Sequence, residues 1–382
     1  MYSLLLSIIY LSFISLGLPD SLLGAGWPVM QGELQVPLSF AGIVSMIIAG
    51  GTILSSLAAE KVGRKFGTGL VTALSVCMTA VALLGFSLST QFWMLILWAI
   101  PYGLGAGAVD AALNNYVALH YSSRHMSWLH CFWGVGASVS PYIMSYALSH
   151  TTWESGYRTV AIVQMILTAC LFLSLPLWKR GTSAQEELPP SRSLSQVLKI
   201  PGVPGVLITF FAYCALESTA GLWAATYLVQ SRSVDAQTAA AFASMFYLGI
   251  TAGRAISGFI SDKLGDRGMI RLGLGIMAGG VVMIFVPVKA VALAGLLITG
   301  LGCAPIYPSI IHATPDNFGK ENSLALVGIQ MASAYTGSTF MPPLFGLIAQ
   351  HISPALFPCY LCLFVLLMIT MNERLNAVLK HK

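Results

Sequence analysis

The sequence predicts an all-α membrane protein with about 12 transmembrane helices in two six-helix pseudo-symmetric bundles. Three observations support this fold class. Of the 382 residues, 56% are hydrophobic and 9% are charged, and the mean hydropathy is +0.79, whereas soluble proteins carry about 25% charged residues. The apolar runs are long enough to cross a bilayer, which takes about 20 residues in a helix. They are also continuous, unlike the alternating segments of a β-barrel.

Twelve apolar runs predict the spans in chain order. The first run begins without basic residues or a small-residue cleavage site, so we expect a retained helix and not a signal peptide. A polar stretch, KRGTSAQEELPPSRSLSQVLK, separates the sixth run from the seventh. We therefore expect an N-terminal bundle over 1–178, a cytoplasmic linker over 179–200 and a C-terminal bundle over 201–382. The spans lie near 4–30, 38–59, 67–88, 91–120, 127–149, 157–178, 203–229, 238–261, 269–287, 290–314, 323–350 and 353–372.

The distribution of basic residues predicts the orientation. With both termini in the cytoplasm, fifteen Lys and Arg residues fall on the cytoplasmic side, against Arg158, Arg232 and Lys289 on the other side. Cytoplasmic loops carry such an excess of positive charge. We expect a multi-pass protein of the cell membrane, inner or plasma, that is monomeric in the lipid bilayer. The net charge of +5 is then a topology signal, and we expect no nucleic-acid partner.

A repeated loop supports the division into halves. The segments SLAAEKVGRK (56–65) and GFISDKLGDR (258–267) match at an offset of 202, each just after the second span of its half. A small residue permits close approach of helices, and the basic residues hold the loop in the cytoplasm. The motif has two interpretations, a topology and packing device or a gate. The residues assigned to it are Glu60, Lys61, Gly63, Arg64, Arg254, Gly258, Asp262 and Lys263.

Three acidic residues, Asp20, Asp110 and Glu217, lie well inside predicted spans. A charge at the bilayer centre costs about 2.5–3.5 kcal/mol on insertion scales, so such residues usually face a cavity and mark a substrate or ion pathway. A buried carboxyl kept neutral by local hydrogen bonds is the alternative. Asp20 and Glu217 occupy matching positions at an offset of 197. A carboxyl in a cavity of low polarity binds protons readily, which suits proton coupling.

Helical spacing places glycines and aromatic residues on the same faces as these acids. Asp20 shares its face with Gly24 and Trp27. An acid, a glycine groove and an aromatic ring suit a sugar, which offers hydroxyls to carboxylates and a C–H face to a ring. Small and aromatic residues also simply pack membrane helices. The other acids have comparable neighbours, namely Gly103, Gly107 and Asn114 for Asp110, and Tyr213, Gly221, Trp223 and Tyr227 for Glu217.

Taken together, the span number, the linker and the repeated loop resemble the major facilitator superfamily. Three segments, GAGAVDAALNNY (105–116), HCFWGVGASVSP (130–141) and GCAPIYP (302–308), resemble the fucose permease-like sugar:proton symporters. The resemblance implies that Asp20 couples protons and that Asp110 and Asn114 bind sugar. It also implies that the first, fourth, seventh and tenth helices surround a central cavity, with Asp20 and Glu217 facing each other across it.

Further candidate residues come from the same segments and faces. His130 is expected either to relay protons or to be a packed histidine. Arg254, near the end of the eighth span, is expected to snorkel or to pair with a helix end rather than touch substrate. The predicted substrate-binding set is Trp27, Asp110, Asn114, Asn115, Trp133, Trp223, Tyr227, Tyr307 and Gln330, and the predicted proton-coupling set is Asp20, His130 and Glu217.

These observations predict a secondary active transporter, not an enzyme, that takes up a sugar or similar small polar solute with protons by alternating access. A proton-driven exporter of drugs or amphipathic compounds is the alternative. Such exporters tend to have a Gly-Pro pair in the fifth helix, and here Gly136 and Pro141 are separated. We expect no metal and no cofactor, because the Cys359 and Cys362 pair has no nearby third ligand.

Overall fold

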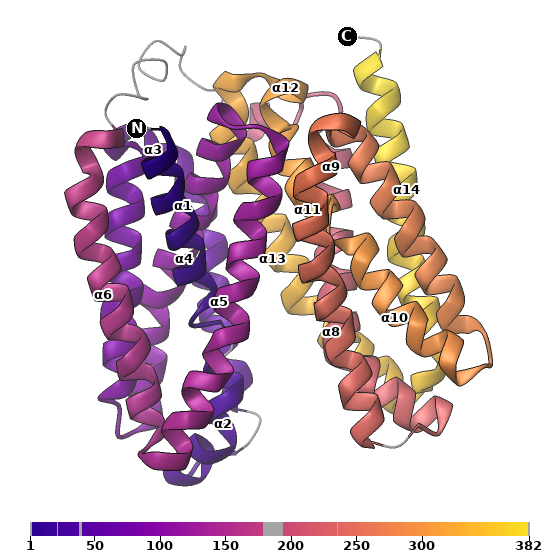
Figure 1. Cartoon of the computed structure of the whole chain (residues 1–382), viewed down its shortest axis with the longest axis horizontal. Helices are drawn as coiled ribbons and strands as arrows, with labels where there is room; N and C mark the ends of the chain where they lie inside the picture. Colours follow the sequence, from indigo (N-terminus) through magenta and orange to yellow (C-terminus); the bar gives the residue numbers. More distant parts are fainter. Residues whose placement is uncertain (1, 21, 38–39, 179–193, 235, 381–382) are drawn as a thin grey trace. The chain divides into compact units, whose positions relative to one another are not determined.

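The computed structural model describes residues 2–20, 22–37, 40–178, 194–234 and 236–380, and every regular element within them is helical. The chain divides into two compact units (Figure 1). Unit 1 comprises Met1–Tyr116 and Leu129–Ser191, and unit 2 comprises Val117–Trp128 and Arg192–Lys382. The connection between the fourth and fifth spans therefore groups with unit 2. Most of the predicted linker, 179–193, lies outside the described residues.

Six helices carry the first half of the chain. The predicted first span is divided into two helices, α1 and α2, by a turn at Leu18–Asp20. The ends of α4 and α5 that join each other belong to unit 2. The helices are α1 (Tyr2–Gly17), α2 (Leu22–Glu33), α3 (Phe40–Ser87), α4 (Phe92–His120), α5 (Ser123–His150) and α6 (Trp153–Trp178).

The second half continues with longer and shorter helices. The predicted seventh span is one uninterrupted helix, α8. The tenth span is divided, because helix α10 ends before Pro305, whose ring cannot continue a helical hydrogen-bond ladder. The elements are α7 (Leu194–Val197), α8 (Val203–Arg232), α9 (Ala236–Phe285), α10 (Lys289–Cys303), α11 (Ile306–His312), α12 (Thr314–Phe318), α13 (Lys320–His351), a 3₁₀ turn (Pro354–Leu356) and α14 (Phe357–Lys380).

Helices α3 and α9 each contain two spans joined at a glycine. Gly67 has φ 74° and ψ 155°, and Gly265 has φ 65° and ψ 167°, a region that glycine occupies readily and other residues avoid. The repeated loop was predicted to align Gly63 with Gly265. That alignment is wrong for the backbone, because Gly63 remains helical and the turn occurs at Gly67.

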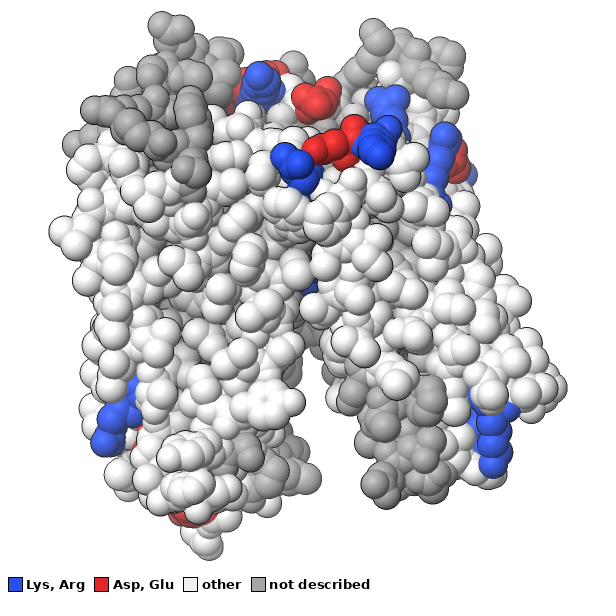
Figure 2. Space-filling view, viewed as in Figure 1, with Lys and Arg blue, Asp and Glu red and all other residues white. Residues whose placement is uncertain are grey.

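The helices of the described chain provide the expected twelve spans. Eight are long and apolar enough to cross a membrane by length and composition. Two of these, α3 and α9, hold two spans each, and the more polar helices α5 and α13 supply the last two. In each unit the charged residues visible in Figure 2 lie mainly near helix ends and leave the flanks uncharged. This is the charge distribution of a multi-pass membrane protein.

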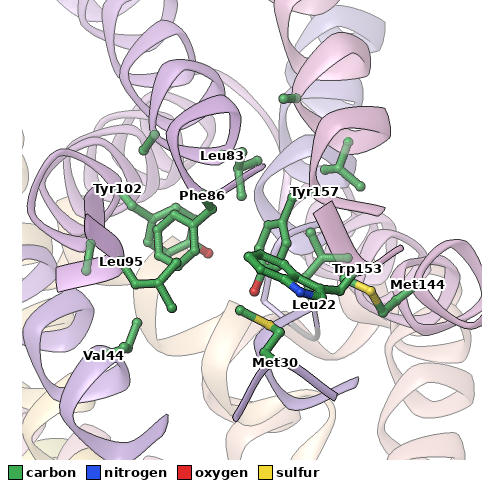
Figure 3. Packing of buried hydrophobic residues seen from close by; sticks show 14 of the residues in the cluster. Leu22, Met30, Val44, Leu83, Phe86, Leu95, Tyr102, Met144, Trp153 and Tyr157 are labelled. Atoms are coloured by element: carbon green, nitrogen blue, oxygen red, sulfur yellow. The ribbon is translucent and has the colours of Figure 1, made fainter. Parts of the chain in front are cut away.

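A cluster of buried side chains holds α2 against the rest of unit 1. Trp153 is 1% exposed, and its indole nitrogen donates to Glu33 Oε2 at 2.7 Å. Tyr157 stacks on Phe86 with ring centroids 5.3 Å apart. The cluster fixes the segment that follows the turn at Asp20. Figure 3 shows its central members, Leu22, Met30, Val44, Leu83, Phe86, Leu95, Tyr102, Met144, Trp153 and Tyr157.

Candidate functional site

The turn that carries Asp20 is caused by the residue before it. Pro19 has no backbone N–H, and its ring clashes with the carbonyl group four residues earlier in a helix, that of Ser15. Helix α1 accordingly ends at Gly17. The amide of Asp20 then donates to Gly17 O at 3.2 Å. The matching position in α8 is Leu216, and α8 runs through without a break.

Two polar side chains compensate for the missing hydrogen bond. Gln164 of α6 donates from Nε2 to Ser15 O at 2.6 Å, the carbonyl that Pro19 cannot serve. Thr79 of α3 donates to Gln164 Oε1 at 2.9 Å. Gln164 is 1% exposed, and an unpaired carbonyl in such a place costs about 1–3 kcal/mol. The pair therefore stabilises the discontinuity in the first span.

Close backbone contact between α1 and α5 brings a partner to Asp20. A Cβ on Gly136 would overlap with the carbonyl oxygen of Ile14. In unit 2, a Cβ on Gly337 of α13 would overlap with the carbonyl oxygen of Phe211 of α8 in the same way. Ile14 and Phe211 are 197 residues apart. This is the offset of Asp20 and Glu217, so each of the two acids lies six residues beyond an equivalent helix contact.

Asp20 accepts two hydrogen bonds and remains exposed. Trp133 Nε1 donates to Oδ2 at 2.9 Å, and the Tyr102 hydroxyl donates to Oδ1 at 3.2 Å. One turn further along, Gly24 is also exposed, and nothing lies within 4 Å of a Cβ placed on it. The predicted combination of an acid, a ring and an open glycine is thus assembled here. Its aromatic member is Trp133, because Trp27 is only 3% exposed and packs edge-on against Phe92.

Asp110 heads a buried row of polar side chains. Asn114 Nδ2 donates to Asp110 Oδ1 at 2.7 Å and to its backbone oxygen at 3.0 Å. Asn114 Oδ1 then lies 3.0 Å from His130 Nε2, so this ring nitrogen must carry the proton and donate. Asp110, Asn114 and His130 are 4%, 0% and 5% exposed. The row is predominantly internal to unit 1, whereas Asp20 is at an accessible surface.

The glycines near the other two acids do not form open grooves, contrary to our expectation. In α4, a Cβ on Gly103 or Gly107 would overlap with a backbone oxygen of α3, that of Ile48 or Thr52 respectively. In α8, Gly221 faces the hydroxyl of Tyr247. These glycines serve helix packing, which was the alternative interpretation.

Glu217 is paired inside unit 2. Arg254 of α9 places Nη2 3.6 Å from Glu217 Oε1, and the two side chains are 5% and 18% exposed. The expectation that Arg254 snorkels or pairs with a helix end is therefore wrong. A buried guanidinium needs a compensating charge, and the carboxylate on the neighbouring helix supplies it.

The remaining predicted substrate residues have polar groups bonded within their unit. Trp223 Nε1 donates to Pro342 O at 2.9 Å, and the Tyr227 hydroxyl donates to Ile284 O at 3.1 Å. Gln330 is 0% exposed and exchanges hydrogen bonds with Thr314 at 3.0 and 3.1 Å. The Tyr307 hydroxyl lies 3.1 Å from Met331 Sδ, and Asn115 is buried. Their assignment to substrate binding stays a prediction.

The loop-motif residues lie inside α3 and α9, just before the glycines at which the two spans of each helix join. Glu60 pairs with Arg64 at 3.0 Å, and Lys61 and Lys263 are exposed. Asp262 lies 3.6 Å from Arg124 at the start of α5. A Cβ on Gly258 would overlap with the indole of Trp128, so the small residue permits the close approach that the motif predicts.

Two contributors to the Asp20 site were absent from the predicted set. Tyr102 lies in an apolar stretch of α4 without an acid at helical spacing, so its contact across helices has no sequence signal. Gln164 does have one, because an amide inside an apolar span needs a partner, and Pro19 leaves a carbonyl that needs a donor. Neither the amide in the sixth span nor the unpaired carbonyl in the first span shows which other helix supplies its partner.

Comparisons with known proteins agree with this architecture. A family model described as Major Facilitator Superfamily matches residues 9–288 and, in a second match, 205–374. Bypass of stop codon protein 6 of Saccharomyces cerevisiae is 21% identical, over 94% of this chain and 80% of its own. The glucose/mannose transporter GlcP of Bacillus subtilis is 20% identical, over 78% of this chain and 77% of its own. The fold is similar to that of the E. coli fucose:proton symporter FucP, with a TM-score of 0.74, 16% identity and 98% coverage of each chain.

Proposed function

The chain belongs to the Major Facilitator Superfamily of transporters, and we propose that it couples proton entry to the uptake of a sugar or similar small polar solute by alternating access. Each proton that moves down a potential of 100 mV supplies about 2.3 kcal/mol, enough for a roughly fiftyfold gradient of a neutral solute. Secondary transporters often bind substrate and coupling ion where a span is discontinuous.

The exposed carboxylate of Asp20 at the break in the first span is the observation that carries the proposal. Trp133 and Tyr102 orient it with one hydrogen bond to each oxygen. A carboxylate that is accessible, yet held in a membrane-spanning segment, can take up a proton and release it. In this proposal Asp20 carries the proton, and the row from Asp110 to His130 belongs to the substrate site.

Sugar is the solute class that the local chemistry favours. The Trp133 ring offers a face for sugar C–H groups, and the accessible Gly24 leaves backbone open to a hydroxyl. The similarity to a glucose/mannose transporter and to a fucose:proton symporter supports the same class.

Uptake of a labelled sugar panel into proteoliposomes tests the proposal, with an inward proton gradient, an inward Na⁺ gradient or no gradient. We expect uphill accumulation of at least one sugar only with the proton gradient. Asp20→Asn should abolish this accumulation and retain sugar exchange, because the amide accepts hydrogen bonds but does not titrate. Asp316→Asn, at an exposed position of α12, is the matched control. Undiminished accumulation by Asp20→Asn would remove that residue from coupling.

A further inference from the structure

We propose that His312 and Asp266 form a pH-sensitive latch on the connection between the fourth and fifth spans. With one proton bound between the two side chains, the latch holds this connection in unit 2, and loss of the proton releases it. The connection is the segment Val117–Trp128, which joins the parts of α4 and α5 that belong to unit 1. The inference goes beyond the proposed function and depends neither on Asp20 nor on a sugar.

The latch joins three parts of unit 2 through one imidazole ring. His312 ends α11, and its Nδ1 lies 2.6 Å from Asp266 Oδ2 of α9. Its Nε2 lies 2.8 Å from the carbonyl oxygen of Tyr121, just after the end of α4. Ser123 begins α5 and donates from Oγ to the other oxygen of Asp266, Oδ1, at 2.5 Å. The connection is therefore attached to the same pair at two points.

The hydrogen-bond chemistry requires a proton between the pair. A backbone carbonyl only accepts, so His312 Nε2 must carry a hydrogen and donate to Tyr121 O. A neutral imidazole has one N–H, so Nδ1 would then present a lone pair to the Asp266 carboxylate, which also only accepts when ionised. Two acceptors 2.6 Å apart would repel each other. The contact therefore holds one proton more than a neutral histidine beside a carboxylate, on either Nδ1 or Oδ2.

The strongest charges that act on His312 are acidic. Asp266 touches the ring, and Asp316 of α12 acts on it electrostatically. Arg124 of the connection has an acid of its own, because it lies 3.6 Å from Asp262. The other titratable side chains of the connection and of α9 beside Asp266 are His120, Tyr121, His125, Lys263 and Arg267. The bound proton is thus balanced by carboxylates of unit 2.

The acid of the latch is particular to the second copy of the repeated loop. Asp266 directly follows the joint at Gly265 and corresponds to Arg64 at the repeat offset of 202. In the first copy, Arg64 pairs with Glu60 of its own loop at 3.0 Å. The second copy has an acid where the first has a base, and α11 supplies the imidazole that uses it.

The latch acts at one end of two helices that carry candidate site residues. Asp110 and Asn114 lie on α4, and His130 and Trp133 lie on α5. The proton at the latch decides whether the connection between these helices keeps both of its attachments. At lower pH the pair is protonated and the connection is held, and as the pH rises the proton is lost and the connection is released. The pH on the side that this connection faces, predicted to be cytoplasmic, thereby regulates the transporter.

Hydrogen–deuterium exchange of the purified full-length protein in lipid nanodiscs tests the proposal without substrate or gradient. Exchange of the segment 117–128 is compared with that of the α9–α10 turn, 286–292, after correction for the chemical exchange rate. The measurements run from about pH 6 to about pH 8.5, across the usual titration range of histidine. We expect exchange in the connection to become about tenfold or more faster at the higher pH, because a hydrogen bond to a charged group is lost. The turn should show no such change.

The variants of the latch have opposite expected effects. His312→Phe keeps a ring and removes both hydrogen bonds, so the connection should exchange fast at both ends of the pH range. Asp266→Asn offers an amide N–H to a neutral Nδ1, so the contact closes without the extra proton and exchange should stay slow throughout. Asp266→Asn also keeps the shape of the side chain and decides the test if His312→Phe does not fold.

Two further variants are matched controls. Asp262→Asn removes the partner of Arg124 at the same connection, and the pH dependence of exchange should persist in it. His351→Phe, at an exposed position at the end of α13, should behave as wild type.

Exchange of the connection that does not change with pH in the wild-type protein would overturn the proposal, as would a pH dependence that survives in Asp266→Asn. These outcomes involve neither Asp20 nor a transported solute. A missing pH effect with normal proton-driven sugar accumulation would remove the latch alone. Failure of accumulation with intact pH-dependent exchange would remove the proposed function alone.

Discussion

Gln164 Nε2 donates to the carbonyl oxygen of Ser15 at 2.6 Å, which is the oxygen that Pro19 leaves without a helical partner. A side chain of α6 thereby supplies the donor that the proline in the first span removes. The hydrogen bond lets the first span stop at Gly17 and resume at Leu22 without an unpaired carbonyl in the membrane. Asp20 lies between these two helices and is exposed.

This relationship predicts a coupling between Gln164 and Pro19. Gln164→Leu should lower the free energy of unfolding by about 1–3 kcal/mol, because Ser15 O loses its donor. Pro19→Leu restores the backbone N–H, as Leu216 does in α8, so Gln164→Leu should cost much less in that background. A double-mutant cycle on thermal or denaturant unfolding measures the difference. Equal costs in both backgrounds would show that Gln164 does not compensate for the proline.

The close helix contacts predict a matched set of glycine variants. Gly136→Ala and Gly337→Ala should each destabilise the protein by about 1–3 kcal/mol, because the added Cβ overlaps with a carbonyl oxygen on α1 or α8. Gly24→Ala should be tolerated, since nothing lies within 4 Å of its Cβ position. Unfolding midpoints of the purified variants check this order. Similar loss at Gly24 would contradict the open surface beside Asp20.

The register of the repeated loop gives another test. Gly67→Ala and Gly265→Ala should each cost about 1–2 kcal/mol, because alanine is strained at positive φ. Gly63→Ala should be neutral or slightly stabilising, because Gly63 is helical and alanine is the better helix former. Stability measurements on the three variants distinguish the two registers. A larger loss at Gly63 than at Gly67 would favour the alignment taken from the motif.

The buried polar row predicts a structural effect at Asn114. Asn114→Leu should lower stability by about 1–3 kcal/mol, because Asp110 and His130 lose the group that bridges them. Asn115→Leu, one position further along the same buried stretch, is the comparison variant. Unfolding with and without the sugar identified by uptake separates stability from binding. Unchanged affinity in a folded Asn114→Leu variant would remove Asn114 from the substrate site.

Several features of the fold followed from local chemistry. Twelve apolar runs, few charges and a repeat were sufficient for a twelve-helix membrane protein. The offset of 197 between Asp20 and Glu217 was predicted from a short alignment, and the contacts of Gly136 with Ile14 and of Gly337 with Phe211 confirm that register.

The environment of each acid depended on neighbours that helical spacing does not identify. Asp20 and Glu217 are equivalent by sequence, yet one lies exposed in a proline break and the other pairs with Arg254 in a continuous helix. The stripe of glycines beside Asp110 predicted a groove, but α3 fills it.

The sequence by itself therefore determined the number of spans, the division into two repeats and the acids that need an explanation, because hydropathy and spacing are properties of a single helix. Only the tertiary structure decided which acid is open, which is paired and which is buried among hydrogen bonds. Those outcomes depend on which other helix covers each face, and a helix does not specify its neighbour by its own periodicity.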